Sequence, residues 1–207
     1  MVTHTGLSTT SPSKKLEAFY GITEDIQLRV GTIVILWAKI EQCIELALWT
    51  IEGEKFIGGR PSTDTKTIGD LCARLNAASQ KFDCQNIGAM LHTSAKAIQN
   101  FSEVRNTIVH GRPLSDSAGT PMLIRNDSIL GETRKRPKTL LSVSEITLHD
   151  IALSLDLLFI VISRLSILFA KKEFVDSSLV TDLKSDLEAA AQKAQIIREA
   201  IENTQIV

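Results

Sequence analysis

Cysteine, glycine and proline are scarce in this chain, and each scarcity narrows the class of protein. The 207 residues include 3 cysteines, 11 glycines and 5 prolines, and 43% of the residues are hydrophobic. An odd number of cysteines without close metal-ligand spacing predicts free thiols in a reducing cytoplasm. The low glycine and proline content, together with the hydrophobic fraction, is typical of one soluble globular domain with a sizeable core.

An overall excess of charge is also lacking. The formal net charge is −1 at pH 7 and the isoelectric point is about 6.4, which argues against a protein that coats nucleic acid with a generally basic surface. Any cationic site must therefore be local. Such an excess lies between residues 105 and 138, where seven Lys or Arg residues stand against three Asp or Glu residues.

The first residues lack the apolar stretch of a signal peptide. They are rich in Ser and Thr, so we predict a flexible N-terminal arm over residues 1–20 and a single domain over residues 21–207. Residues 151–170 are strongly apolar, but Asp156 and Arg164 interrupt the stretch. A buried core helix is therefore predicted there in place of a membrane span, and no membrane association is expected.

Apolar residues recur every three or four positions through most of the chain, which is typical of amphipathic helices. The pattern predicts helices over residues 24–51, from about 67 to 79, and over 85–110, 148–171 and about 177–203. The helical period disappears over residues 120–143, where apolar triplets flank turn-forming residues and predict a short β-hairpin. The predicted fold class is all-α: an up-and-down bundle of about five helices with a hairpin insertion after the third helix.

Three residues with chemistry of interest lie where the helix over residues 85–110 should end, directly before Gly111. Arg105 carries a permanent, fork-shaped cation that suits a phosphate, and His110 carries an imidazole, a group that exchanges protons near neutral pH. Asn106 and His110 share an accessible polar stripe of this helix. Arg105 lies at the margin of the apolar seam, where a buried cation requires a partner.

The spacing of Arg105 and His110 also bears on oligomeric state. On an ideal helix the two residues lie about 140° apart around the axis and ~7.5 Å apart along it, so they do not share one face. One copy of the chain then makes an incomplete site. Pairing two helix ends about a two-fold axis would bring the arginine of one copy near the histidine of the other, and we therefore expect a homodimer.

Four residues separate Arg105 from His110, and the first of them is the polar Asn106. This motif resembles the motif of the HEPN superfamily. The long first helix with Trp37 and Glu41, the break at Gly111 and the hairpin are also similar to members of that family. The resemblance covers roughly residues 24–171. The specificity of so short a motif comes from its place at the end of a long helix in an all-α chain.

What the resemblance implies is a metal-independent endoribonuclease, of a toxin–antitoxin or phage-defence system, that works as a homodimer. The 2′-hydroxyl of the RNA would attack the neighbouring phosphate and leave a cyclic phosphate end. In that reaction His110 would act as general base or acid, Arg105 would stabilise the phosphorane, and Asn106 would orient the histidine or the phosphate. RNA is the expected substrate, an antitoxin or another regulatory protein is a further candidate partner, and no cofactor or metal is expected.

Other interpretations of the same residues stay open. Arg and His in a last helical turn are also ordinary helix-end chemistry, so the alternative function is a non-catalytic helical module that binds protein, nucleotide or RNA. Glu41 either pairs with Arg105 or is a solvated carboxylate. A set of basic residues either grips an RNA backbone or protects a hairpin edge from unwanted pairing: Arg112, Arg134, Lys135, Arg136 and Lys138.

Overall fold

A computed structural model describes residues 11–54, 61–82, 85–128, 135–136, 138–171 and 177–203. Within these ranges the chain is mostly helical and also carries one small antiparallel sheet, as the sequence predicts in outline. The elements in chain order are α1 Pro12–Tyr20, α2 Glu24–Glu52, α3 Ile68–Ser79, α4 Gln85–His110, β1 Arg112–Ser115, β2 Pro121–Arg125, β3 Thr139–Ser142, α5 Glu145–Lys171 and α6 Ser177–Asn203.

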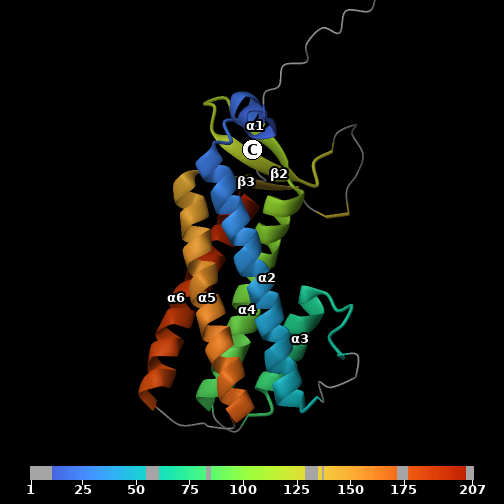
Figure 1. The fold of residues 1–207 in the computed structure, drawn as a ribbon, viewed down its shortest axis with the longest axis vertical. Helices are drawn as coiled ribbons and strands as arrows, with labels where there is room; N and C mark the ends of the chain where they lie inside the picture. The colour runs from blue at the N-terminus through green and yellow to red at the C-terminus, as the bar shows by residue number, and fades with distance from the viewer. Residues whose placement is uncertain are drawn as a thin grey trace, which may run out of the picture.

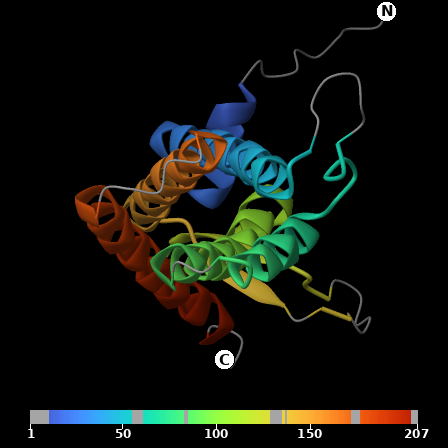
Figure 2. The same cartoon turned by 90° about the horizontal axis from the view of Figure 1, so that it is seen from below.

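The long helices run along the long axis of the molecule, and the sheet lies with α1 at one end (Figure 1). α2 packs along α5, and α4 packs against both α3 and α6. Seen along the bundle, α2 and α5 lie side by side, with α4 and α6 across from them (Figure 2). The apolar stripes predicted from the sequence face the interior between these helices. In α4 the buried stripe consists of Ile87, Leu91, Ile98, Phe101, Val104 and Ile108.

The ends of α2 follow ordinary capping chemistry. The Thr23 hydroxyl accepts a hydrogen bond from the backbone N–H of Ile26 at 3.3 Å, which satisfies one of the free donors of the first turn. At the other end Gly53 adopts a left-handed conformation with φ 68°, which glycine enters without the steric cost of a Cβ. Trp37 lies in the core at 1% exposure, as expected for an aromatic residue on the apolar face.

The predicted flexible arm over residues 1–20 is wrong for its second half, because residues 12–20 form α1. Ser11 caps this helix through a hydrogen bond from the backbone N–H of Lys14, Pro12 occupies its first position, and Gly21 ends it with φ 67°. Leu16 and Tyr20 pack against the core. Short polar helices give little periodicity, so the capping residues carried the usable signal. Residues 1–10 lie outside the described residues.

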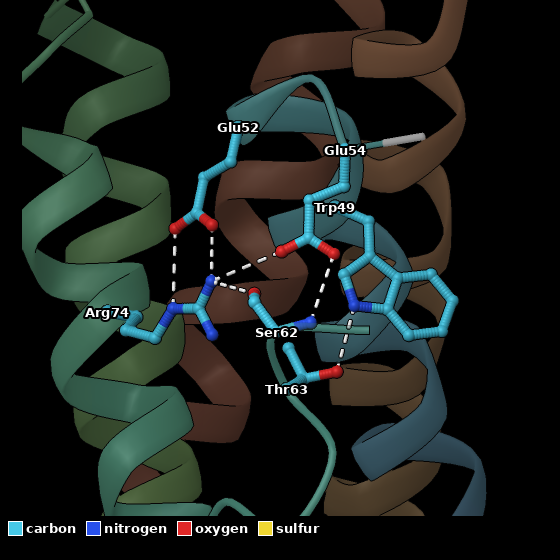
Figure 3. A network of polar contacts seen from close by, with 6 residues as sticks. All are labelled: Trp49, Glu52, Glu54, Ser62, Thr63 and Arg74. Carbon is cyan, nitrogen blue, oxygen red and sulfur yellow. Dashed lines mark hydrogen bonds and ion pairs between the residues drawn. The ribbon is translucent and has the colours of Figure 1, made fainter. Parts of the chain in front are cut away.

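A polar network connects the last turn of α2, the residues Ser62 and Thr63, and α3 (Figure 3). The Arg74 guanidinium of α3 donates to both carboxylate oxygens of Glu52 and to the Ser62 hydroxyl, and it also pairs with Glu54. The indole N–H of Trp49 donates to the Thr63 hydroxyl at 2.8 Å. These contacts of Arg74 tie the end of α2 to α3.

The sheet has three strands in the order β1-β2-β3, where a two-stranded hairpin was predicted. The additional strand is β1, which pairs antiparallel with β2 so that Arg112 lies opposite Ile124. A four-residue strand that contains Pro113 has too little alternation to be recognised in sequence. On its other side β2 pairs with β3, which places Arg125 opposite Thr139.

α5 begins three residues earlier than the capping pattern at Thr147 predicted. The hydroxyl of Ser144 accepts a hydrogen bond from the backbone N–H of Thr147 at 3.1 Å, so Ser144 is the cap. Among the described residues α5 is the one helix long and apolar enough to cross a membrane. One of its faces lies in the core, as a buried bundle helix requires, and the same composition satisfies a membrane span.

Two of the three cysteines fall in the described residues, and both are free thiols. Burial raises the pKa of the Cys72 thiol to about 11. Burial also raises the pKa of Cys43, against an opposing hydrogen bond with Ser163. Both thiols are therefore held in the protonated, unreactive form. Cys84 lies outside the described residues.

Candidate functional site

A cavity of about 500 Å³ opens where the end of α4 meets the sheet. Two of the three motif residues, Asn106 and His110, line it, together with cationic and polar residues from the strands and the segments that follow them. Three arginines and one aspartate contribute its charged side chains. The full lining is Asn106, His110, Arg112, Ile124, Arg125, Asn126, Asp127 and Arg136.

The last turns of α4 hold Asn106 and His110 at this cavity. His110 is exposed and Asn106 is half-buried, which confirms the predicted accessible stripe. The buried hydroxyls of Thr107 on α4 and Thr139 on β3 share a hydrogen bond of 3.2 Å, which ties the helix end to the sheet. Gly111 then closes the helix with a backbone hydrogen bond from its N–H to the Thr107 carbonyl oxygen at 2.8 Å. The histidine is thus placed between two anchored elements.

Arg105 is absent from the described residues that line the cavity. Its Nη1 donates to the side-chain oxygen of Asn106 at 3.2 Å, so it reaches the site through its neighbour. The side chain is half-buried, and its Nε is buried without a hydrogen-bond partner among the described residues. The structure therefore agrees with the helical-wheel argument that Arg105 and His110 face different directions in one copy.

Of the two roles left open for Glu41, partner of Arg105 or solvated carboxylate, the first is not seen among the described residues. Its Oε1 accepts a hydrogen bond from the indole N–H of Trp37 at 2.7 Å, and the described residues show no ion pair between Glu41 and Arg105. The two residues on α2 are one turn apart, so the carboxylate satisfies the donor of a buried indole that would otherwise lack an acceptor.

The basic residues predicted to bind RNA divide into two groups. Arg112 and Arg136 line the cavity. Lys135 and Lys138 are exposed outside it, and Arg134 lies outside the described residues. Within the first group Arg112 donates to Asp127 at 3.0 Å, and this carboxylate also lies 3.9 Å from the ammonium of Lys138. Asp127 therefore neutralises part of the positive charge at the cavity.

Sequence reasoning missed four of the residues that line the cavity, and Arg125 is the cation among them: Ile124, Arg125, Asn126 and Asp127. Arg125 ends β2 and is only 9% exposed, although it lines the cavity. Its Nη2 pairs with a carboxylate oxygen of Glu103 at 3.3 Å. The sequence did contain one indication of its position, because Arg125 directly follows the apolar run 122–124. Alternate residues of a strand point to the same face, so Arg125 shares the inward face of Leu123.

No group of three or more His, Cys, Asp or Glu side chains among the described residues is placed to hold a metal ion. Comparison of the chain with models of known families, with curated proteins and with solved structures finds no match. The site is therefore interpreted from its own residues and geometry.

Proposed function

We propose that this protein is a metal-independent endoribonuclease that cleaves RNA by attack of the 2′-hydroxyl on the adjacent phosphate. One observation carries the proposal: a single cavity is lined by an accessible histidine, a carboxamide and three arginines, contributed by α4, β1, β2 and the segment around residue 136. These are the groups that this reaction needs, a proton-transfer group beside several fixed cations. The resemblance of the motif to the HEPN superfamily points to the same chemistry.

The proposed reaction assigns a task to each group. The imidazole of His110 removes the proton from the 2′-hydroxyl, whose oxygen bonds to phosphorus as the bond to the 5′-oxygen breaks. A proton returns to that 5′-oxygen, and the products are a 2′,3′-cyclic phosphate and a 5′-hydroxyl end. Arg112 and Arg136 lie where they would stabilise the negative charge on the phosphorane. Asn106 would hold the histidine or the phosphate in position.

Arg105 leads to a proposal about assembly. In one copy of the chain its guanidinium lies behind Asn106 and outside the cavity. We propose a symmetric homodimer in which Arg105 of one copy completes the site that contains His110 of the other.

The cellular setting is proposed from the resemblance alone. It implies a cytoplasmic ribonuclease of a toxin–antitoxin or phage-defence system, with an antitoxin or other regulatory protein as a partner. The local cationic cavity within a chain of net charge −1 fits a protein that acts on RNA at one place without binding it over its whole surface.

The alternative function is a non-catalytic helical module that binds protein, nucleotide or RNA. The hydrogen bond that Arg105 donates to the adjacent Asn106 favours this alternative. It gives both side chains a structural role at the end of α4 that involves no substrate. Under this alternative RNA survives incubation, while loss of Arg105 lowers thermal stability.

The experiment that separates the two functions uses mixed cellular RNA in the presence of EDTA. We expect the wild-type protein to degrade it to fragments with cyclic phosphate ends, and His110→Ala to be slower by about 10²–10⁴-fold. The matched control is His92→Ala, which removes an exposed histidine from the same helix. His92 lines a different surface cavity and contacts Asn76, so this variant should retain activity. Intact RNA with wild-type protein, or equal cleavage by His110→Ala, would overturn the proposal.

A further inference from the structure

Arg125 has an incomplete set of partners for a buried cation. Its Nη2 pairs with a carboxylate oxygen of Glu103 at 3.3 Å, and the Glu103 side chain is itself 48% exposed. The other terminal nitrogen, Nη1, is buried and has no hydrogen-bond partner among the described residues. A buried guanidinium normally has its donors satisfied, because an unpaired N–H that has lost water is costly.

Arg74 shows how this chain treats an arginine whose role is structural. Its guanidinium is engaged by two carboxylates and one hydroxyl, although the side chain is 24% exposed (Figure 3). Arg125 is more buried, at 9% exposure, and has fewer partners among the described residues. The contrast indicates that the partner which completes Arg125 does not belong to the part of the chain that the structure describes.

The position of Arg125 indicates where that partner would lie. Arg29 and Arg105 also have a buried nitrogen without a partner among the described residues. Of these three arginines, Arg125 is the one that lines the cavity beside His110. An anion in the cavity would meet Arg125 at a wall that Arg112 and Arg136 also line.

We propose that Arg125 is a phosphate-binding residue of this cavity, and that the cavity holds a phosphate of single-stranded RNA. This proposal rests on the proposed function for the identity of the polymer, while the phosphate site itself follows from the orphaned guanidinium. A fork-shaped cation gives a phosphate two parallel hydrogen bonds, which a lysine cannot supply. Arg125 would then position the nucleotide, while His110 transfers the proton.

Size and lining favour a single strand over a duplex. A volume of about 500 Å³ lies within the range of small-ligand sites, which suits one unstacked nucleotide unit. The carboxamides of Asn106 and Asn126 line the same cavity. They offer donors and acceptors that a base edge or a 2′-hydroxyl can use, and such groups are accessible in unpaired RNA.

The test measures binding of a short single-stranded 2′-O-methyl oligonucleotide, which cannot be cleaved because its attacking hydroxyl is blocked. We expect Arg125→Met to weaken binding by about tenfold or more. The slope of log affinity against log salt should also fall by about 0.7, the contribution of one phosphate contact on a single strand. Arg125→Lys keeps the charge and should give a smaller loss, and it replaces Arg125→Met if that variant fails to fold.

Two control variants separate the proposal from a structural role. Glu103→Gln removes the recorded partner of Arg125 but does not touch the cavity, so binding should not weaken. Arg74→Met removes the arginine of α3 that pairs with Glu52 and Glu54 and should lower thermal stability without changing affinity. If Arg125 merely held Glu103 in place, Glu103→Gln and Arg125→Met would have the same effect on binding.

The outcomes also distinguish this inference from the proposed function. Normal affinity in both Arg125 variants, or no binding of the oligonucleotide to the wild-type protein, overturns the inference even if RNA is cleaved. Loss of affinity in Arg125→Met, with no cleavage of RNA by the wild-type protein, supports the phosphate site and contradicts the proposed ribonuclease function.

Discussion

Gly111, between His110 and Arg112, should tolerate a side chain least of the glycines that the structure describes. A Cβ atom at this position would lie far inside the contact distance of the Thr107 carbonyl oxygen and 3.0 Å from the Cβ of Leu123. The carbonyl is part of the helix and Leu123 is part of the sheet, so neither can move aside alone. Gly111 is not among the glycines with positive φ. The requirement is therefore close approach of α4 to β2, and not a left-handed conformation.

The cost of Gly111→Ala follows from these contacts. Overpacking of a well-packed site costs about 1–3 kcal/mol. Displacement of Gly111 also weakens its backbone hydrogen bond to Thr107, a term of about 1 kcal/mol. Loss of freedom in the unfolded chain returns about 0.4–1 kcal/mol. We therefore expect the free energy of unfolding to fall by about 2–3 kcal/mol, a large part of the 5–15 kcal/mol of a typical domain.

Urea unfolding followed by circular dichroism measures this change, and two other glycines provide controls. Gly31→Ala, on an exposed position of α2 with open space around it, should stabilise the protein by about 0.5–1 kcal/mol through helix propensity. Gly53→Ala has open space but φ +68°, so it should cost about 1–2 kcal/mol from backbone strain alone. A Gly111→Ala protein as stable as the wild type would refute the close-approach reasoning.

Three further predictions concern assembly, charge and thiol reactivity. If two copies share the site, mixing the inactive Arg105→Ala and His110→Ala proteins should restore about a quarter of wild-type cleavage. Half of the dimers in the mixture are hybrids, and each hybrid has one intact site out of two. If no cleavage is restored, Arg105 and His110 act within one copy. Asp127→Asn frees Arg112 and Lys138 and should tighten RNA binding up to about fivefold, so unchanged or weaker binding contradicts the assigned role. With a pKa of about 11, the Cys72 thiol has a thiolate fraction of roughly 10⁻³ at pH 8. Mass spectrometry should therefore find Cys72 alkylated only after unfolding. Rapid alkylation of the native protein would show that Cys72 is not buried.

The long helices could be predicted from the sequence because a helix with one buried face has apolar residues at every third or fourth position. The bounds predicted for residues 85–110 match those of α4, and the polar stripe with Asn106 and His110 is accessible. The helix start predicted near residue 67 also agrees with the structure, because the Thr67 hydroxyl accepts a hydrogen bond from the N–H of Asp70 and caps α3. In these cases the local chemistry and the tertiary packing favour the same structure.

The features that sequence reasoning missed depend on partners distant in the chain. The alternation over residues 123–125 indicates an inward position for Arg125, but nothing near it in sequence shows that Glu103 is its partner, because strand pairing and the packing of the sheet on α4 decide it. Glu41 is an exception, because its partner Trp37 lies one turn away on the same helix. β1 was missed because a short strand acquires its pattern only from the neighbour with which it pairs.

The central claim is that the cavity beside His110 cleaves RNA through the substrate's own 2′-hydroxyl. Its most direct test uses a pool of single-stranded DNA oligonucleotides of random sequence, each with one ribonucleotide at its centre, in the presence of EDTA. We predict that the wild-type protein cuts only after that ribonucleotide and leaves a 2′,3′-cyclic phosphate. Under the same conditions His110→Ala should leave the pool intact. Cutting at deoxyribonucleotides, or equal cutting when the central 2′-hydroxyl is methylated, would contradict the claim.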